Sequence, residues 1–242
     1  MKTLTIIPSR LSATRLPGKP LLKINGISII SHVFKRAQKA NIGDVFVATE
    51  DKEIFDDVVN NGGQAILTHK NHKTGTDRIY EALQKLKING VDLIMNLQGD
   101  EPDININDIV KLNKKMINLQ CKMGTLAGKI KDLDDLKNEN IVKVITKKNL
   151  DLDEFSHAET FLRKASNIDN IYHHIGIYCY SKDALEKFVN LSQSKNEINK
   201  RLEQLRALDN QININVALAS FSPRGIDTKE DYLALKKIME YK

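Results

Sequence analysis

The stretch IIPSRLSATRLPGKPLL, residues Ile6 to Leu22, decides how the rest of this chain is interpreted. It begins as an apolar run that ends at Pro8 and continues as a loop carrying Arg10, Arg15 and Lys19. Open α/β sheets bind ligands at the loops that follow the carboxyl ends of their strands. Arginine offers a planar fork of donors and lysine a mobile point charge, so these cations suit a polyphosphate. A solvated basic loop is the alternative for any one of them.

The dipeptide Pro17-Gly18 predicts a tight turn just before Lys19, which would fix where the ammonium group points. The loop is not a P-loop, because Lys19 is followed by Pro20 rather than by serine or threonine. The glycine spacing of a dinucleotide fold is also missing. The sequence therefore predicts a phosphate-binding loop of another kind.

Length and composition narrow the class of protein. The 242 residues fit one large α/β domain, or a core domain with a small appendage. The chain has only Cys121 and Cys179, without metal-ligand spacing, and no apolar run approaches the roughly 18 residues of a membrane helix. We therefore expect a cytoplasmic protein without membrane insertion. The net charge of +6 comes from scattered lysines rather than from a basic stripe, so nucleic-acid binding is not predicted.

Apolar runs and amphipathic stretches alternate along the chain, which predicts an α/β fold. We expect a three-layer, doubly wound arrangement with a mainly parallel (mixed) sheet and helices on both of its faces. Strands are predicted over residues 3–8, 45–48, 65–67, 92–97, 123–130, 141–146, 172–178 and 214–218. Helices are predicted over residues 28–40, 51–59, 79–87, 104–120, 181 or 183 to 189, 202–206 and 232–239.

The sequence Gln98-Gly99-Asp100-Glu101-Pro102 follows the predicted strand 92–97. A carboxylate at the end of a central strand, after a glycine that lets backbone approach a ligand, can hold a divalent cation. Magnesium typically takes one or two protein carboxylates and completes its shell with water and phosphate oxygens. An ordinary turn is the alternative. Asp100 is the candidate metal ligand.

Two further motifs open helices. His72 to Arg78, HKTGTDR, precedes the predicted helix 79–87, and its threonine and aspartate can simply cap that helix. Gly225 to Asp231, GIDTKED, opens the last helix and reads as a capping box. Both stretches place charged side chains beside helix starts.

Together these motifs resemble the signatures of the sugar-activating nucleotidyltransferases, and most closely those of the 3-deoxy-manno-octulosonate cytidylyltransferases. The family pattern is roughly IIPARxxSTRLPGKPL at the N-terminus, with HxSGTDR, QGDEP, HxGIYxY, LEQLR and GIDTPED following in the same order. Ser9 stands in place of the usual alanine, Ala13 in place of serine and Lys229 in place of proline. The resemblance covers nearly the whole chain.

The resemblance implies cytidylyl transfer from CTP to 3-deoxy-D-manno-octulosonate (KDO), giving CMP-KDO and pyrophosphate for lipopolysaccharide biosynthesis. It further implies a Mg²⁺ cofactor, a homodimer, and one nucleotidyltransferase domain over residues 1–242 whose part 147–212 binds sugar and dimerises. The implied catalytic residues are Arg10, Lys19, Asp100 and Asp227, with Asp100 and Asp227 as metal ligands. The implied nucleotide contacts are Ser9, Arg10, Arg15, Lys19, Arg78, Gln98 and Asp100, and the implied sugar contacts are Gln98, His157, His174, Glu203 and Asp227.

The sugar side departs from the family pattern at one point. Where relatives carry FSRxxIP, this chain reads Phe155-Ser156-His157-Ala158, so His157 replaces an arginine expected to contact the acidic sugar. A histidine could substitute when protonated or as a neutral donor, or Arg163 could reach in from the following segment. His174 could be a structural histidine, and Glu203 could pair with Arg206 at helical spacing.

Other functions remain open at this stage. The acceptor could be a related acidic sugar, such as 8-amino-KDO or a sialic-type sugar. The chain could be a CTP-binding sensor without turnover, although the pair Asp100 and Asp227 argues against it. A glycosyltransferase is disfavoured, because the usual Asp-x-Asp motif is absent at the strand that leads to Asp100.

Overall fold

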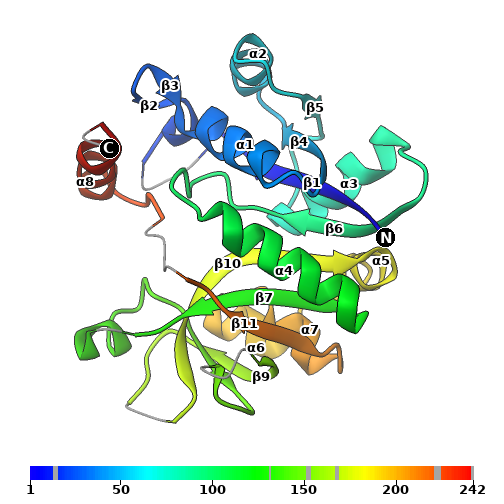
Figure 1. Cartoon of the computed structure of the whole chain (residues 1–242), viewed down its shortest axis with the longest axis vertical. Helices are drawn as coiled ribbons and strands as arrows, with labels where there is room; N and C mark the ends of the chain where they lie inside the picture. The colour runs from blue at the N-terminus through cyan, green and yellow to red at the C-terminus, as the bar shows by residue number, and fades with distance from the viewer. Residues whose placement is uncertain (13–15, 131, 151–153, 167–168, 221–224, 241–242) are drawn as a thin grey trace. The chain divides into compact units, whose positions relative to one another are not determined.

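The computed structural model describes residues 1–12, 16–130, 132–150, 154–166, 169–220 and 225–240 (Figure 1). The chain forms two compact units. We call the first, Lys2–Val110 with Pro223–Lys242, the parallel-sheet unit, and the second, Met1 with Lys111–Ser222, the mixed-sheet unit. Among the described residues, no helix combines the length and the apolar character that crossing a bilayer requires.

The parallel-sheet unit is built on four parallel strands in the order β5-β4-β1-β6, namely Ala65–Leu67, Gly43–Thr49, Lys2–Ser9 and Val91–Asn96. Helices α1 (Ile29–Ala40), α2 (Lys52–Asn60) and α3 (Gly75–Leu86) connect them. β4 and β5 lie on one side of β1 and β6 on the other, so right-handed crossovers put α3 on the opposite sheet face from α1 and α2. The three-layer α/β prediction is confirmed for this unit.

The core of this unit explains why its strands are apolar runs rather than alternating patterns. Leu4, Ile6 and Ile7 of β1 are fully buried, because helices cover both faces of a parallel sheet. A short hairpin, β2 (Lys23–Ile24) and β3 (Ile27–Ser28), precedes α1 and was not predicted. It lies beside the last helix, α8 (Lys229–Glu240), where the Tyr232 hydroxyl donates to the Lys23 carbonyl (Figure 1).

The mixed-sheet unit has the strand order β10-β7-β11-β9-β8, and β8 also pairs with β10. The strands are Ile171–Ser181, Met123–Gly128, Ile214–Leu218, Phe155–Leu162 and Lys143–Thr146, and only the β7–β11 pair is parallel. Its helices are α5 (Lys182–Val189), α6 (Lys195–Lys200) and α7 (Leu205–Asp209), with a 3-10 turn η2 (Leu133–Leu136). Strand β9 and helix α6 were not predicted.

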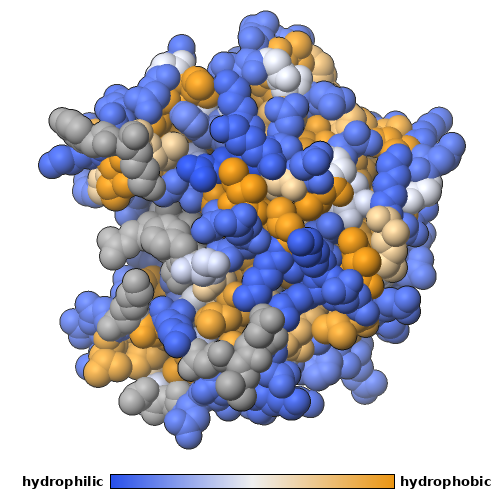
Figure 2. Space-filling view, in the orientation of Figure 1, coloured by the Kyte–Doolittle hydropathy of each residue, from blue (hydrophilic) through white to orange (hydrophobic). Residues whose placement is uncertain are grey.

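Helix α4 (Ile106–Leu119) carries the chain from one unit into the other. Its buried residues Ile109, Leu112 and Met116 recur at helical spacing, which is the amphipathic pattern that the sequence predicted. The side of α4 that faces the viewer is largely hydrophilic in the space-filling view (Figure 2).

Several predicted boundaries were wrong. α3 begins at Gly75, four residues before the predicted start, because Thr74 and Asp77 form a capping box. Residues 202–204 lie before α7 rather than in it. The last helix begins at Lys229, three residues early. Local capping chemistry, which apolar spacing does not register, decides the two early starts.

Candidate nucleotide and sugar site

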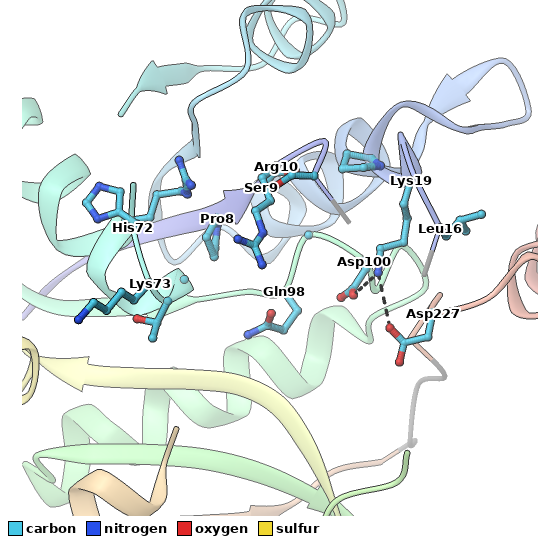
Figure 3. Close-up of a pocket in the computed structure, with 16 residues that line it drawn as sticks. Pro8, Ser9, Arg10, Leu16, Lys19, His72, Lys73, Gln98, Asp100 and Asp227 are labelled. Carbon is cyan, nitrogen blue, oxygen red and sulfur yellow. Dashed lines mark hydrogen bonds and ion pairs between the residues drawn. The ribbon is translucent and has the colours of Figure 1, made fainter. Parts of the chain in front are cut away.

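A pocket of about 360 Å³ lies within the parallel-sheet unit, at the carboxyl ends of its strands (Figure 3). This volume is in the range of small-molecule sites. Its lining combines residues of the four motifs that the sequence singled out: Pro8, Ser9, Arg10, Ser12, Leu16, Lys19, Pro20, His72, Lys73, Thr74, Gly75, Arg78, Gln98, Gly99, Asp100 and Asp227. The structure thus brings together every predicted nucleotide residue except Arg15, which lies outside the described residues.

The loop after β1 is fixed at its base by backbone and carboxylate contacts. The Leu11 N–H donates to Asp51 Oδ2 at 2.7 Å, and the Leu11 carbonyl accepts from the Gly18 N–H at 3.4 Å. Gly18 has φ +68°, a left-handed conformation that glycine adopts readily at the predicted Pro17-Gly18 turn. Asp51 stands at the N-cap position of α2, but its side chain makes no capping hydrogen bond and instead holds the loop after β1.

Lys19 points at the two predicted metal ligands (Figure 3). Its Nζ donates to Asp100 Oδ2 at 2.7 Å and to the Ile226 carbonyl at 2.6 Å, and lies 3.7 Å from Asp227 Oδ1. The Ile226 N–H donates to the Asp100 carbonyl at 3.1 Å, which fastens the two carboxylate-bearing loops to each other. Carboxylates 127 positions apart in the sequence therefore share one cation.

Glycine and a buried acid shape the loop after β6. A Cβ on Gly99 would lie 3.1 Å from both Ile30 Cδ1 and the Pro8 carbonyl oxygen, so the glycine permits close packing against β1. Burial raises the pKa of Glu101 to about 8, and the neighbouring Asp100 charge adds to the effect. Glu101 is therefore mostly neutral at pH 7, while Asp100, 31% exposed, faces the pocket.

Arg78 is held from outside the pocket. Its Nη2 pairs with Glu50 Oε2 at 2.5 Å, and its Nη1 donates to Thr68 Oγ1 at 2.6 Å and to the His69 carbonyl. With 3% of its side chain exposed, the guanidinium is rigidly oriented at the pocket wall. The nucleotide contact that the family resemblance implies for Arg78 would have to use the remaining guanidinium hydrogens.

The sequence reasoning missed His72 and Lys73 as pocket residues, although they lie in the same motif as Arg78. His72 Nε2 bonds Glu81 Oε2. Burial opposes ionisation of Glu81, but Lys85, the His69 N–H and His72 outweigh it and lower its pKa to about 2. An ionised Glu81 orients the imidazole at the rim of the pocket.

The remaining sugar candidates, His157, His174 and Glu203, belong to the mixed-sheet unit. A bulge in β10 between Ile175 and Tyr178 brings the rings of His174 and Tyr178 to 5.4 Å. Glu203 lies close enough to Tyr178 that, after burial and Tyr180, it helps to raise the pKa of the phenol well above its usual value. Tyr178, not predicted, therefore lies with His174 and Glu203.

His174 is neutral and its tautomer is fixed. Burial, with a smaller contribution from His173, lowers the pKa of His174 to about 3. Thr125 Oγ1 donates to the Ile177 carbonyl at 2.7 Å and so accepts from His174 Nε2 at 3.1 Å. The Nε2–H tautomer leaves Nδ1 as an acceptor.

Buried polar atoms in this unit that have no hydrogen-bond partner among the described residues include His157 Nδ1 and the Tyr178 hydroxyl. Such atoms usually find partners, so both are open to a polar ligand. Arg163, in contrast, donates to the carbonyls of Glu139, Lys200 and Arg201, which opposes a role in sugar binding.

Arg206 takes part in a buried ion pair rather than in a site. Its guanidinium donates to both oxygens of Glu197, at 2.8 and 2.6 Å, and lies over the Phe188 ring. The sequence offered Glu203 as a salt-bridge partner of Arg206, and the structure shows a buried salt bridge of Arg206 with Glu197 of α6. A contact between separate elements of this kind has no spacing signal in the sequence.

Comparisons with known proteins agree over the full length of the chain. The profile of the family described as cytidylyltransferase matches residues 4–214. A 3-deoxy-manno-octulosonate cytidylyltransferase of Rhodopseudomonas palustris is 41% identical, covering 99% of this chain and 98% of its own length. A 3-deoxy-manno-octulosonate cytidylyltransferase of Thermodesulfovibrio yellowstonii is 43% identical, again covering 99% of this chain and 98% of its own length. A solved CMP:2-keto-3-deoxy-manno-octonic acid synthetase complexed with CTP superposes with a TM-score of 0.90 at 33% identity, covering 100% and 99%.

Proposed function

Because the chain belongs to the 3-deoxy-manno-octulosonate cytidylyltransferases, within the cytidylyltransferase family, we propose that it joins CTP and KDO to give CMP-KDO and pyrophosphate. This is the activation step that supplies the sugar for lipopolysaccharide. One geometric observation supports the assignment above others. The cations of the phosphate loop and the carboxylates Asp100 and Asp227 line one pocket.

The reaction moves one phosphoryl centre. The anomeric hydroxyl oxygen of KDO bonds to the α-phosphorus of CTP and its proton is released to solvent. The bond from that phosphorus to the α,β-bridging oxygen breaks, and pyrophosphate departs with the bonding electrons. Such a transfer depends on positioning and charge neutralisation more than on covalent chemistry by the protein. Arg10 and Lys19 would gather the triphosphate and stabilise the departing pyrophosphate.

Asp100 and Asp227 would hold Mg²⁺. Two carboxylates are the donor set that magnesium prefers when nucleotide phosphates complete its shell. An ammonium group already lies within 3.7 Å of both carboxylates, so the position suits a cation. When bound, the ion would polarise the α-phosphate and orient the sugar oxygen.

On the sugar side, we propose His174 and Glu203 as ligands of the sugar hydroxyls and His157 as the residue that faces its acidic part. The buried His157 Nδ1, without a partner among the described residues, supports an acceptor or donor role there. The same atom favours the second candidate, a related acidic sugar such as 8-amino-KDO or a sialic-type sugar.

The experiment is pyrophosphate release from CTP and Mg²⁺ with a panel of acidic keto sugars. We expect release with KDO. If pyrophosphate is released only with another sugar of the panel, the transfer mechanism stands and that sugar, not KDO, is the acceptor. CTP binding without release across the panel would contradict an enzyme and favour a sensor.

The homodimer, the cytoplasmic location and the role of residues 147–212 stay predictions from the sequence. Light scattering coupled to size-exclusion chromatography would test the homodimer.

A further inference from the structure

The Lys19 ammonium occupies a place that is built entirely from oxygen acceptors. Asp100 Oδ2 and the Ile226 carbonyl lie 2.7 and 2.6 Å from Nζ, and Asp227 Oδ1 lies 3.7 Å away. An ammonium group has three donors, and three oxygens surround this one. Only 13% of the Lys19 side chain is exposed, so the ammonium is largely shielded from solvent, while Asp100 and Asp227 are 31% and 37% exposed. This is a coordinated cation position rather than a surface salt bridge.

A divalent cation bound by Asp100 and Asp227 would need the same space. Magnesium binds carboxylate oxygens at about 2.0–2.1 Å, closer than an ammonium nitrogen approaches them. An ammonium hydrogen-bonded to the same carboxylate oxygen would then lie next to a doubly charged ion in a partly desolvated site, where like charges repel strongly. Lys19 and the metal therefore exclude each other from this position.

We propose that Asp100 and Asp227 form one cation site that the Lys19 ammonium and a divalent metal occupy in turn. The proposal rests on the metal assignment made for the proposed function. Metal entry releases Lys19 from the carboxylates, and the released ammonium then binds triphosphate oxygens in the same pocket. Lys19 thus makes metal binding and nucleotide binding depend on each other, and this coupling is reciprocal.

The local structure lets the exchange proceed through the side chain alone. The backbone around Lys19 is held by bonds from the Lys19 N–H to the Leu16 carbonyl and from the Leu21 N–H to the Gly18 carbonyl. Pro20, which follows, is buried. Lysine has a flexible four-carbon stem, so Nζ can leave the carboxylates by rotation about side-chain bonds.

Removing the ammonium should therefore favour the metal. In Lys19→Met, the two carboxylates lose their shared counterion and repel each other, which a divalent cation relieves. The matched control is Lys73→Met, because Lys73 lines the same pocket but lies at its other end from Lys19 in Figure 3. The control removes one positive charge without vacating the site.

The first experiment titrates Mn²⁺ alone, without CTP, into the wild type and both variants and follows free Mn²⁺ by electron paramagnetic resonance. We expect Lys19→Met to lower the Kd for Mn²⁺ about tenfold and Lys73→Met to change it by about twofold or less, because the ion–ion energy falls with distance and is screened by salt. Equal affinities in the two variants would overturn the shared site.

The second experiment uses the wild type, so it does not depend on how a variant folds. The rate at which an amine-reactive reagent labels Lys19 is measured by mass spectrometry with and without saturating Mn²⁺. We expect Mn²⁺ to accelerate labelling of Lys19 severalfold and to leave Lys73 unchanged, since a salt-bridged amine reacts slowly. Labelling of Lys19 that is unchanged or slowed by bound Mn²⁺ would refute the exchange.

Asp100→Asn separates the exchange from the metal assignment. If this variant binds Mn²⁺ in the presence of CTP as the wild type does, the metal assignment fails, and the exchange fails with it. If Asp100→Asn loses Mn²⁺ but Lys19→Met gains no affinity, the assignment stands and the exchange alone is wrong. The account requires both the loss in Asp100→Asn and the gain in Lys19→Met.

Discussion

Lys19 of the parallel-sheet unit and Lys143 of the mixed-sheet unit are both largely removed from solvent, yet their partners differ in kind. Lys19 faces the carboxylates of Asp100 and Asp227 in an open pocket. Lys143 is fully buried and donates to the backbone carbonyls of Asn138, Ile141 and Arg163. In the open pocket, Lys19 can leave the carboxylates and bind a ligand, because another cation can take its place. Buried carbonyls that lose the Lys143 ammonium have no other hydrogen-bond donor.

The same contrast runs through the two units. Around the pocket of the parallel-sheet unit, charged side chains face one another and the space where a ligand would bind. In the mixed-sheet unit, Arg163 and Arg206 serve the fold, and the sugar candidates are neutral or polar groups such as His174 and Tyr178. A charged side chain in this protein therefore predicts chemistry when it faces the open pocket, and it supports the fold when its partners are buried with it, as for Arg206 and Glu197.

The largest expected effect comes from Asp100→Asn. Loss of the carboxylate should lower turnover by at least about a thousandfold, the scale of removing a key electrostatic group from a transfer site. The thermal unfolding midpoint should stay near that of the wild type. Steady-state pyrophosphate release would measure turnover, with Asp56→Asn on α2 as a matched control. Near-normal turnover that still needs Mg²⁺ would contradict the assignment of Asp100 as a metal ligand.

Lys143→Met tests the other side of the comparison. Leaving buried carbonyls without a donor should lower the free energy of unfolding by about 3 kcal/mol. Lys19→Met should lose turnover instead and keep most of its stability. Urea denaturation of both variants measures this, and a Lys19 variant as destabilised as the Lys143 variant would erase the distinction.

His174 gives the protein an acid sensitivity with a defined sign. Its pKa is about 3 in the folded protein against 6.5 normally, so below pH 6.5 the unfolded chain binds a proton that the folded one refuses. Unfolding free energy should therefore fall on acidification, by about 2 kcal/mol between roughly pH 6 and 4. Denaturation curves of His174→Gln should lack this component; equal pH slopes in both proteins would refute a buried neutral histidine.

Asp51→Ala probes how the phosphate loop is positioned. Without the bond to the Leu11 N–H, the loop should lose its fixed base, and KM for CTP should rise about tenfold with kcat changed little. If the role of Asp51 were purely structural, Asp51→Ala would lower the melting temperature and leave KM for CTP unchanged. An unchanged KM would show that the loop is held elsewhere.

His157→Arg is expected to have the smallest effect. It introduces the arginine of the family pattern FSRxxIP at this position and should improve kcat/KM for KDO by about threefold to tenfold through a charge-assisted contact with the sugar acid. Unaltered kinetics would dismiss His157 as a specificity element.

Much of the parallel-sheet unit could be predicted from sequence, because buried parallel strands are short apolar runs and their loops carry continuous motifs. Residues Ala65–Leu67 of this unit were predicted at their observed bounds, as were residues Ile214–Leu218 of the mixed-sheet unit. The hairpin β2–β3 and strand β9 were not, since they are short or mix polar with apolar residues.

Contacts between residues far apart in the sequence limit how much of the site can be predicted from the sequence. Nothing in the spacing of Asp51 links it to Leu11, and nothing near Arg206 points to Glu197 across the turn before α7. The convergence of Lys19, Asp100 and Asp227 followed from the family resemblance and not from periodicity. Their direct contact, which underlies the proposed exchange, required the structure.

The most direct test of the account is phosphorus NMR of one reaction containing the protein, CTP, KDO and Mg²⁺. We expect a phosphodiester signal of the CMP-sugar and a pyrophosphate signal to grow at equal rates as CTP is consumed. CTP that stays intact, or pyrophosphate that forms together with free CMP and no CMP-sugar, would contradict cytidylyl transfer to KDO.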